Sequence, residues 1–297
     1  MTERLEIAAL DVPVEGGRLA AFALGRDGDG RPPVIAVHGI TASSRTWLAV
    51  ARALGHRVPL VAVDLRGRGA SHVLPAPYGT AAHVADLLAL LDRLELARAV
   101  LVGHSLGAYL VSRLAVEHPD RVSALVLVDG GLPIPGSQGV DPQEFIDGFL
   151  GPALARLRLR FASPEAYRNW WRAHPAIAGG DVAEPDLIAY ADYDLIGEPP
   201  ELRSAVLEPA VRADAAELAE AGQWAPALTV PATLLCAPRG LIDDPHPMQP
   251  LAEANRWASG APERAAYPVD DVNHYTITLG ATGAAAVAEL IASTAGA

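Results

Sequence analysis

The sequence predicts an α/β protein in which a mainly parallel eight-stranded sheet is covered by helices on both faces. Short runs of valine, isoleucine and leucine alternate along the chain with longer segments of helical periodicity, and this alternation is typical of parallel sheets. The chain has 297 residues and is 51% apolar, which is enough to bury a large core. We therefore expect a globular chain organised around such a sheet.

The expected strands are short apolar runs bounded by turn residues. The first two are connected through Glu15, Gly16 and Gly17, and glycines in such a turn predict an antiparallel hairpin at the edge of the sheet. We expect strands near residues 4–10, 18–24, 33–38, 58–64, 99–103, 122–129, 232–237 and 264–269.

The expected helices follow most of these strands. In the segment 80–95, leucine and valine recur at the spacing of one helical face, so this helix should pack on the sheet. We expect core helices near residues 44–54, 80–95, 106–117, 248–259 and 280–293.

The segment between Asp129 and Ala232 is too long for a simple connection. It spans about 100 residues, whereas a strand-to-helix loop usually has about two to six residues. Helical patterns separated by proline and glycine predict a helical cap over the site, with a core formed by 1–131 and 227–297 and a cap formed by 132–226. The cap helices are expected near residues 141–150, 152–161, 164–173, 185–193 and 201–221.

Charge and the N-terminal composition limit the partners and the compartment. The net charge is −12, so a nucleic acid is not an expected partner. Glu3, Arg4, Glu6 and Asp11 interrupt the first residues, which lack the apolar centre of a signal peptide. No uncharged apolar run approaches the roughly 18 residues that span a membrane. We expect a cytoplasmic protein that does not act on a membrane.

The cysteine content argues against disulfide and thiolate chemistry. Cys236 is the single cysteine, which excludes an internal disulfide and makes a thiolate metal site implausible. It lies in the strand-like run 233–236, where we expect it to be a small buried apolar residue. Neither a metal nor another cofactor is expected.

One short motif points to chemistry. A strand-like run at 99–102 leads into Gly103-His104-Ser105-Leu106-Gly107, and a helix-like run at 108–117 follows. A G-x-S-x-G motif between a strand and a helix predicts a nucleophile elbow. The glycines matter because this turn crowds the backbone and holds the serine in a strained conformation. Ser105 is therefore the candidate nucleophile.

Three further segments strengthen this interpretation. The first is a strand-like run that ends in His38, Gly39 and Ile40. The second is the run 61–71, which leaves a strand through a glycine-rich loop, and the third contains His274 just after the last expected strand. In the order and spacing of these segments the chain resembles the α/β-hydrolase family over nearly its whole length. This resemblance implies the α/β-hydrolase fold, often with an inserted cap.

The candidate base is His274. A serine needs a base to accept its proton and a third group to orient that base, and the order Ser, Asp, His is the one expected of this fold. We expect His104 to point away from Ser105 and His38 to hold the loop that follows it. The other histidines lack a surrounding motif and are expected to be solvated or locally bonded: His56, His72, His83, His118, His174 and His246.

The acid departs from the common family pattern. Many relatives place an aspartate in the loop after the strand that follows the cap, where this chain has Gly240. Asp129, at the end of an earlier strand, and Asp243, in the loop itself, are the two replacements. We prefer Asp129 because a strand end is a more rigid platform than a loop tip, and Asp243 remains the alternative.

Acyl transfer also needs donors for the oxyanion. The backbone N–H of Leu106 follows the nucleophile at a helix start. By resemblance to the family, the N–H of Ile40 is the second donor. Bulky residues are expected near the substrate: Trp47, Tyr109, Phe145, Phe149, Trp170, Trp171 and Tyr275.

The expected function is that of a serine carboxylic ester hydrolase that needs no cofactor. Haloalkane dehalogenases and epoxide hydrolases carry an aspartate at the elbow, so Ser105 argues against both. The expected substrate is a small or medium apolar ester. A thioester, a lactone or a carbon–carbon bond cleaved by the same residues is an alternative, and so is a ligand-binding protein without catalysis. The sequence does not decide between a monomer and a homodimer.

Overall fold

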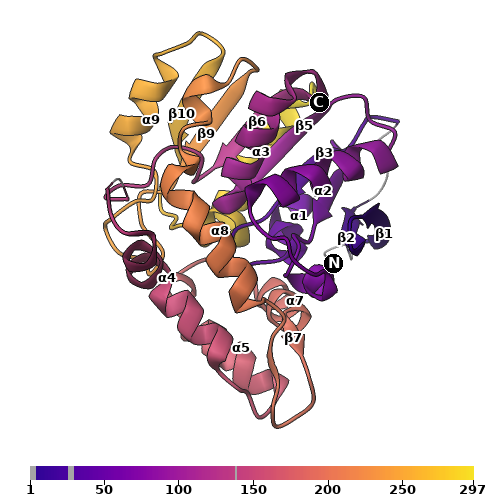
Figure 1. Cartoon of the computed structure of the whole chain (residues 1–297), viewed down its shortest axis with the longest axis vertical. Coiled ribbons are helices and arrows are strands. Elements are labelled where there is room, and N and C mark those ends of the chain that lie inside the picture. Colours follow the sequence, from indigo (N-terminus) through magenta and orange to yellow (C-terminus); the bar gives the residue numbers. More distant parts are fainter. Residues whose placement is uncertain (1–4, 26–29, 138) are drawn as a thin grey trace.

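The predicted α/β architecture is confirmed. The protein is represented by a computed structural model that describes residues 5–25, 30–137 and 139–297. Its central feature is an eight-stranded sheet with the order β1-β2-β4-β3-β5-β6-β9-β10 (Figure 1). The strands are β1 (Ile7–Val14), β2 (Gly17–Leu24), β3 (Val34–Val37), β4 (Leu60–Val63), β5 (Ala99–His104), β6 (Val122–Val128), β9 (Ala232–Cys236) and β10 (Arg264–Pro268).

The strand directions explain where a site can form. The hairpin β1–β2 is antiparallel, β2 also pairs antiparallel with β4, and the strands from β4 to β10 pair in parallel. The chain passes from β3 to β4 on one side and to β5 on the other, so the strand order reverses at β3. Ligands of open parallel sheets bind at the carboxyl ends of the strands near such a reversal.

Both faces of the sheet are covered by helices. Successive side chains of a strand point to opposite sides, so each strand contributes to the core on both faces. Ile35 and Val37 of β3 join an apolar cluster with α2 (Thr80–Arg93), α3 (Leu106–Glu117) and α9 (Leu251–Ala258). Val34 and Ala36 join a second cluster with α1 (Leu48–Leu54) and α11 (Ala281–Thr294). The short helix α10 (Thr276–Leu279) packs against α1 and α11.

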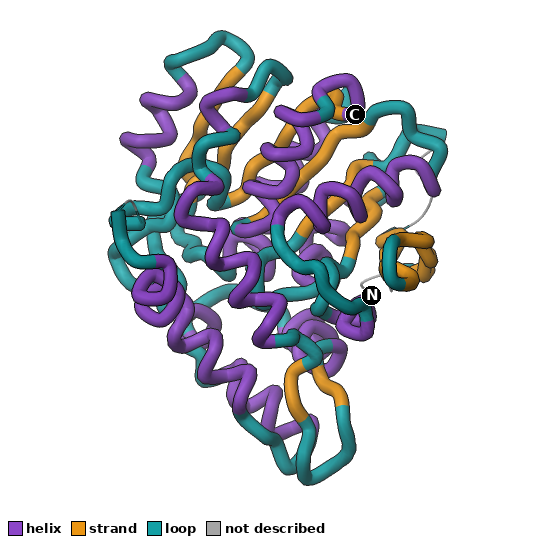
Figure 2. The backbone as a smooth tube through the Cα atoms, viewed as in Figure 1, coloured by secondary structure: helices purple, strands orange, loops and turns teal. Residues whose placement is uncertain are grey.

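The segment between β6 and β9 forms a helical insertion beyond one end of the sheet (Figure 1, Figure 2). The insertion comprises α4 (Pro142–Arg158), α5 (Pro164–Arg172), α6 (Pro175–Ala178), α7 (Glu184–Tyr193), β7 (Leu195–Ile196), β8 (Arg203–Ser204) and α8 (Glu208–Ala221). Apolar side chains of α5, α6 and α7 form a third cluster that is rich in aromatic residues, whereas those of α4 and α8 join the first cluster.

Two element predictions in the insertion are wrong. The expected break between 150 and 152 is absent, and Pro152 lies inside one continuous helix, α4. Leu150 and Leu154 are buried on either side of the proline, so packing compensates for the hydrogen bond that proline removes. The expected helix at 201–221 begins only at Glu208, because the residues before it pair as the hairpin β7–β8.

In the part of the chain that the structure describes, no helix is both long and apolar enough to cross a bilayer.

Candidate active site

Ser105 lies at the turn between β5 and α3 with φ +54° and ψ −123°. A non-glycine residue with positive φ is strained, so the backbone here is held by its surroundings. A Cβ added to Gly103 would lie 2.3 Å from the carbonyl oxygen of Gly107, and one added to Gly107 would lie 2.1 Å from that of Val37. The two motif glycines are therefore required by close backbone approach, which leaves Ser105 at the carboxyl end of the sheet.

Asp129 and His274 are in direct contact. The Nδ1 atom of His274 lies 2.7 Å from Oδ2 of Asp129, and both side chains are buried. The backbone N–H of Ala237 on the neighbouring strand end donates to the other carboxylate oxygen of Asp129 at 3.1 Å. Because Nδ1 donates to the carboxylate, Nε2 of His274 is left as the acceptor.

Ser105 and His274 both line a cavity of about 350 Å³. Within the described residues, no hydrogen bond joins the Ser105 hydroxyl to the His274 ring. Such bonds are often long or poorly aligned in the free form of an enzyme and tighten when substrate binds. The arrangement places a serine, an imidazole and a buried carboxylate at one end of the sheet.

Asp243 does not contact His274. Its Oδ1 accepts hydrogen bonds from Nε of Arg239 at 2.6 Å and from Nδ2 of Asn273 at 2.9 Å. A Cβ at Gly240 would lie 2.5 Å from the carbonyl oxygen of His246, so the loop is folded too tightly there for a larger side chain. The structure thus brings Asp129, and not Asp243, to the candidate base.

The loop that follows β3 lies against Ser105. A Cβ at Gly39 would lie 3.1 Å from Cβ of Ser105, and Ile40 and Leu106 line the same cavity. His38 holds this loop, because its Nδ1 donates to the carbonyl of Gly39 at 2.7 Å while its Nε2 accepts from the N–H of Leu65 at 3.0 Å. Burial lowers the pKa of His38 to about 3, so the ring is neutral.

Two buried arginines that the sequence analysis missed hold consecutive carbonyls of this loop. Nε of Arg68 donates to the carbonyl of Ile40 at 3.0 Å, and Nη2 of Arg156 donates to that of Thr41 at 2.9 Å. Arg68 belongs to the glycine-rich loop after β4, whereas Arg156 comes from α4 of the insertion. The loop is therefore anchored from both the core and the insertion.

Each arginine is paired with an aspartate of the insertion. Nη2 of Arg68 lies 2.6 Å from Oδ2 of Asp214, and Nη1 of Arg156 lies 2.7 Å from Oδ2 of Asp194. His83 also contacts Asp214, at 3.1 Å, and is fully buried, so the expectation that it is solvated or only locally bonded is wrong. These contacts join residues more than 30 positions apart, so no local sequence pattern indicates them.

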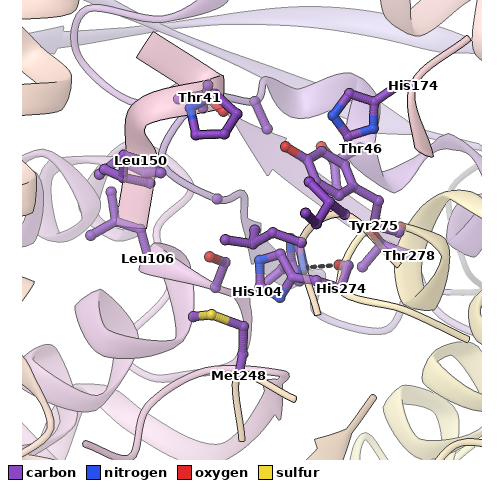
Figure 3. A pocket seen from close by; sticks show the side chains of 18 of the residues that line it. Thr41, Thr46, His104, Leu106, Leu150, His174, Met248, His274, Tyr275 and Thr278 are labelled. Carbon is purple, nitrogen blue, oxygen red and sulfur yellow. Dashed lines mark hydrogen bonds between the residues drawn. The ribbon is translucent and has the colours of Figure 1, made fainter. Parts of the chain in front are cut away.

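The expectation that His104 points away from Ser105 is wrong, because both residues line the same cavity. Nε2 of His104 donates to the backbone carbonyl of His274 at 2.9 Å, and the two rings lie 4.7 Å apart (Figure 3). The strand continues to His104, which projects to the same face as Val102, where the segment with His274 packs. Burial, followed by the neighbouring His274, keeps the pKa of His104 well below its usual value.

The bulky residues predicted near the substrate separate into two groups. Tyr109, Trp170 and Tyr275 line the cavity. Trp47 and Trp171 are fully buried outside its lining, Trp47 under α1 and Trp171 within the aromatic cluster of the insertion. They were misplaced because periodicity cannot tell a buried core tryptophan from one at a cavity wall. Phe145 and Phe149 lie on α4, and their side chains are outside the described part of the chain.

Further cavity residues had no sequence signal. His174, expected to be solvated or locally bonded, caps α6 and lines the cavity, and burial followed by Arg156 lowers its pKa to about 4. Thr41, Thr46, Leu150, Arg156, Met248 and Thr278 also line it.

The site offers no ligand set for a metal ion among the described residues. No cluster of three or more His, Cys, Asp or Glu side chains suited to a metal occurs among the residues that the structure describes. Cys236 is buried, and burial, followed by the nearby Asp129, raises the pKa of its thiol to about 12. The thiol therefore stays protonated at neutral pH and is a poor metal ligand.

Comparison with known families agrees with this architecture. The model of the α/β hydrolase fold family matches residues 32–196, which is more than half of the chain. The chain therefore belongs to the α/β-hydrolase fold family.

Individual relatives cover less of the chain. It is 38% identical to Lipase LipV of Mycobacterium tuberculosis over 154 residues, which are 51% of this chain and 56% of that protein. The chain spans about half the length of the curated relatives it matches, or less.

Solved structures match over nearly the whole chain at low identity. An E-2-(acetamidomethylene)succinate hydrolase has a TM-score of 0.78 at 20% identity, with 98% of this chain and 100% of that chain covered. Carboxylesterase CesB of Bacillus subtilis has a TM-score of 0.66 at 16% identity, with 97% and 91% covered. At these identities the likeness concerns the fold.

Proposed function

We propose that the chain is a serine hydrolase that cleaves a carboxylic ester through an acyl-enzyme intermediate. The observation that carries this proposal is the contact between His274 Nδ1 and Asp129 Oδ2 at 2.7 Å, beside a strained Ser105 that shares a cavity with His274. The match to a lipase over half of the chain supports the same class of reaction.

The reaction follows from the positions of these groups. His274 Nε2 accepts the proton of the Ser105 hydroxyl as the serine oxygen attacks the ester carbonyl, and Asp129 stabilises the imidazolium that forms. The alkoxide oxygen that develops is held by the backbone N–H groups of Ile40 and Leu106. His274 then protonates the leaving alcohol, and a water molecule activated by the same imidazole hydrolyses the acyl-enzyme.

The loop anchors give the oxyanion donors a fixed position. Arg68 and Arg156 hold the carbonyls of Ile40 and Thr41, so the peptide groups on either side cannot rotate freely. Preorganised donors are worth more than mobile ones, because no reorganisation is needed as charge develops. The loss of one such donor costs about 3 to 4 kcal/mol of transition-state stabilisation.

The decisive experiment is Ser105→Ala. We expect hydrolysis of p-nitrophenyl butanoate to fall by about 10⁶-fold, to the background rate, because the nucleophile is lost, and labelling by a fluorophosphonate to disappear. Ser112→Ala is the matched control, because Ser112 lies two turns further along α3 and its buried hydroxyl has no partner among the described residues. This control should retain both activity and labelling.

Two results would contradict the proposal. The first is esterase activity that persists in Ser105→Ala, with circular dichroism unchanged. The second is a folded wild-type protein that neither reacts with the fluorophosphonate nor cleaves any ester, which would instead favour a ligand-binding protein on this scaffold.

A further inference from the structure

The cavity beside Ser105 has two chemically different ends. In Figure 3, Leu106, Leu150 and Met248 lie on one side of the His104 and His274 rings. On the other side Figure 3 shows the polar side chains of Thr46, His174, Tyr275 and Thr278. Tyr190, which contacts Thr46, and Arg156, which interacts electrostatically with Tyr190 and Tyr275, also line the cavity. A wholly apolar ester would use only one of these ends.

Arg156 is the strongest polar group at this second end. Of the cavity residues that the structure describes, it is the one with a permanent positive charge. Burial disfavours the charged guanidinium, but Tyr167 and Asp194 outweigh burial, and the pKa of Arg156 lies above its usual value. The guanidinium is therefore charged at any pH at which the protein is folded.

The hydrogen bonds of Arg156 leave donors unused. Nη1 contacts Asp194 at 2.7 Å, the Tyr167 hydroxyl at 2.5 Å and Ser204 at 3.4 Å, while Nη2 donates to the carbonyl of Thr41 at 2.9 Å. A guanidinium has five N–H groups. The N–H of Nε and the second hydrogen of Nη2 meet no acceptor within the described parts of the chain.

The neighbouring groups add donors without a competing carboxylate. Tyr190 and Tyr275 carry hydroxyls at this end of the cavity, and burial raises the pKa of both, so both keep their protons. Asp194 contacts Arg156 from outside the lining. Asp244 does line the cavity, but it lies on the loop that carries Met248, and its Oδ1 is hydrogen-bonded to the backbone N–H and the ring of His246.

We propose that the substrate carries a carboxylate group, which the free N–H groups of Arg156 bind while Ser105 attacks an ester bond in the same molecule. The inference rests on the proposed function and narrows its substrate class to esters with an acidic group on one side and an apolar group on the other. Paired N–H donors of an arginine suit a carboxylate in geometry and charge. The expected apolar ester is thereby replaced by an amphipathic one.

The test compares esters of equal shape that differ in charge. On the acyl side, the p-nitrophenyl monoester of glutaric acid is compared with the p-nitrophenyl ester of 5-methylhexanoic acid, which has methyl groups in place of the carboxylate oxygens. On the alcohol side, the pentanoate ester of 3-hydroxypropanoate is compared with that of 3-methylbutan-1-ol. In at least one pair, kcat/KM should be about 10-fold to 100-fold higher for the anionic ester.

Variants of Arg156 assign the preference to this residue. Arg156→Met should abolish the preference for the anionic ester. Because Arg156 also holds the carbonyl of Thr41, kcat/KM should fall for both esters, so the ratio of the two kcat/KM values is the quantity that tests the inference. Because Arg156→Met leaves Asp194 buried without a cation, the double variant with Asp194→Leu is tested in parallel to preserve the fold. Arg160→Met is the control. It removes the same charge from an exposed arginine that lies beyond the end of α4.

The outcomes separate this inference from the proposed function. If the neutral esters are cleaved with dependence on Ser105 but neither pair shows a preference for charge, the carboxylate site is wrong and the hydrolase stands. A preference that survives in both Arg156 variants also overturns the inference. If no ester is cleaved, calorimetric titration with the monoamide of glutaric acid and with 5-methylhexanamide decides. Only a carboxylate site binds the anionic amide more tightly than the neutral one, and only in the presence of Arg156.

Discussion

The core of the sheet and the core of the insertion consist of different types of side chain. The two clusters on the faces of the sheet consist mostly of valine, leucine, isoleucine and alanine. In the insertion, Tyr167, Trp171 and Tyr190 pack around the buried pair of Arg156 and Asp194. Aliphatic burial dominates in the two clusters of the sheet, the first of which also includes side chains of α4 and α8. The outer part of the insertion combines aromatic contacts with the buried pair of Arg156 and Asp194.

This difference has consequences for stability and for function. Aliphatic burial is non-directional and roughly proportional to area, so the sheet supplies a rigid frame that carries Ser105 and Asp129 at strand ends. A buried ion pair contributes little net stability, yet it is costly to break. The insertion thus depends on a few specific side chains, and one of them, Arg156, faces the cavity.

The largest effect is expected on kcat when Asp129, at the end of a strand of the sheet, is replaced. Asp129→Asn should lower kcat by about 10³-fold to 10⁴-fold, because an asparagine cannot orient and stabilise the imidazolium of His274 as a carboxylate does. Asp243→Asn is the matched control on a loop and should change kcat only a few-fold. Steady-state kinetics with a p-nitrophenyl ester measures both. Equal losses in the two variants, or a greater loss in Asp243→Asn, would refute the assignment of the acid.

The next prediction compares the two cores by asking whether the stability losses of two substitutions add up. Asp194→Leu should lower the free energy of unfolding by about 3 to 5 kcal/mol, because it leaves the buried Arg156 charge unpaired. Adding Arg156→Met should restore part of that loss. In the sheet, Leu101→Ala and Leu234→Ala should each cost about 2 to 5 kcal/mol, and their costs should add, because β5 and β9 flank β6 about 10 Å apart.

Urea denaturation measures these free energies. The loss of unfolding free energy in the double variant Asp194→Leu/Arg156→Met should be smaller than the sum of the losses in its two single variants. If it equals that sum, as expected for Leu101→Ala and Leu234→Ala, Arg156 and Asp194 are not energetically coupled and the contrast between the two cores is wrong.

A smaller effect concerns acid stability. Burial alone would raise the pKa of Asp214, but Arg68 and His83 outweigh it and lower the pKa to about 2. A carboxylate whose pKa is lower in the folded chain stabilises the fold above its unfolded pKa of about 3.9, and this contribution is lost as the pH falls toward 2. The difference in unfolding free energy between wild type and Asp214→Asn should therefore narrow, by an amount on the order of 2 kcal/mol, between pH 4 and pH 2.

Urea titrations at several pH values in this range provide the measurement. A difference between the two proteins that stays constant over the range would show that the pair of Arg68 and Asp214 does not carry this dependence.

The smallest effect concerns the hydrogen bond between His104 and the backbone carbonyl of His274. His104→Leu removes the hydrogen bond to the carbonyl of His274 and should lower kcat/KM by about 2-fold to 10-fold, the usual value of one such bond. His104→Gln keeps a donor near the position of Nε2 and should retain most of the activity. Equal losses in the two variants would indicate that ring packing matters more than the hydrogen bond.

Most of the sheet could be predicted because its signals are local. Each strand is a short apolar run, and the hairpin at Gly16 follows from turn chemistry. The insertion was predicted less well. A break was expected between residues 150 and 152, where α4 is continuous, and β8 was expected to be part of a helix at 201–221, since tertiary packing overrides weak local preferences there.

The sequence by itself determined the α/β framework, the strained turn at Ser105 and the need for glycine at 103, because these depend on residues close in the chain. The need for glycine at 107 also comes from the carbonyl of Val37 on the neighbouring strand β3. Only the tertiary structure decided which aspartate contacts His274, since Asp129 and His274 are 145 positions apart. It also decided that His104 and Arg156 face the cavity. Such contacts depend on how distant elements pack, and sequence periodicity indicates only local structure.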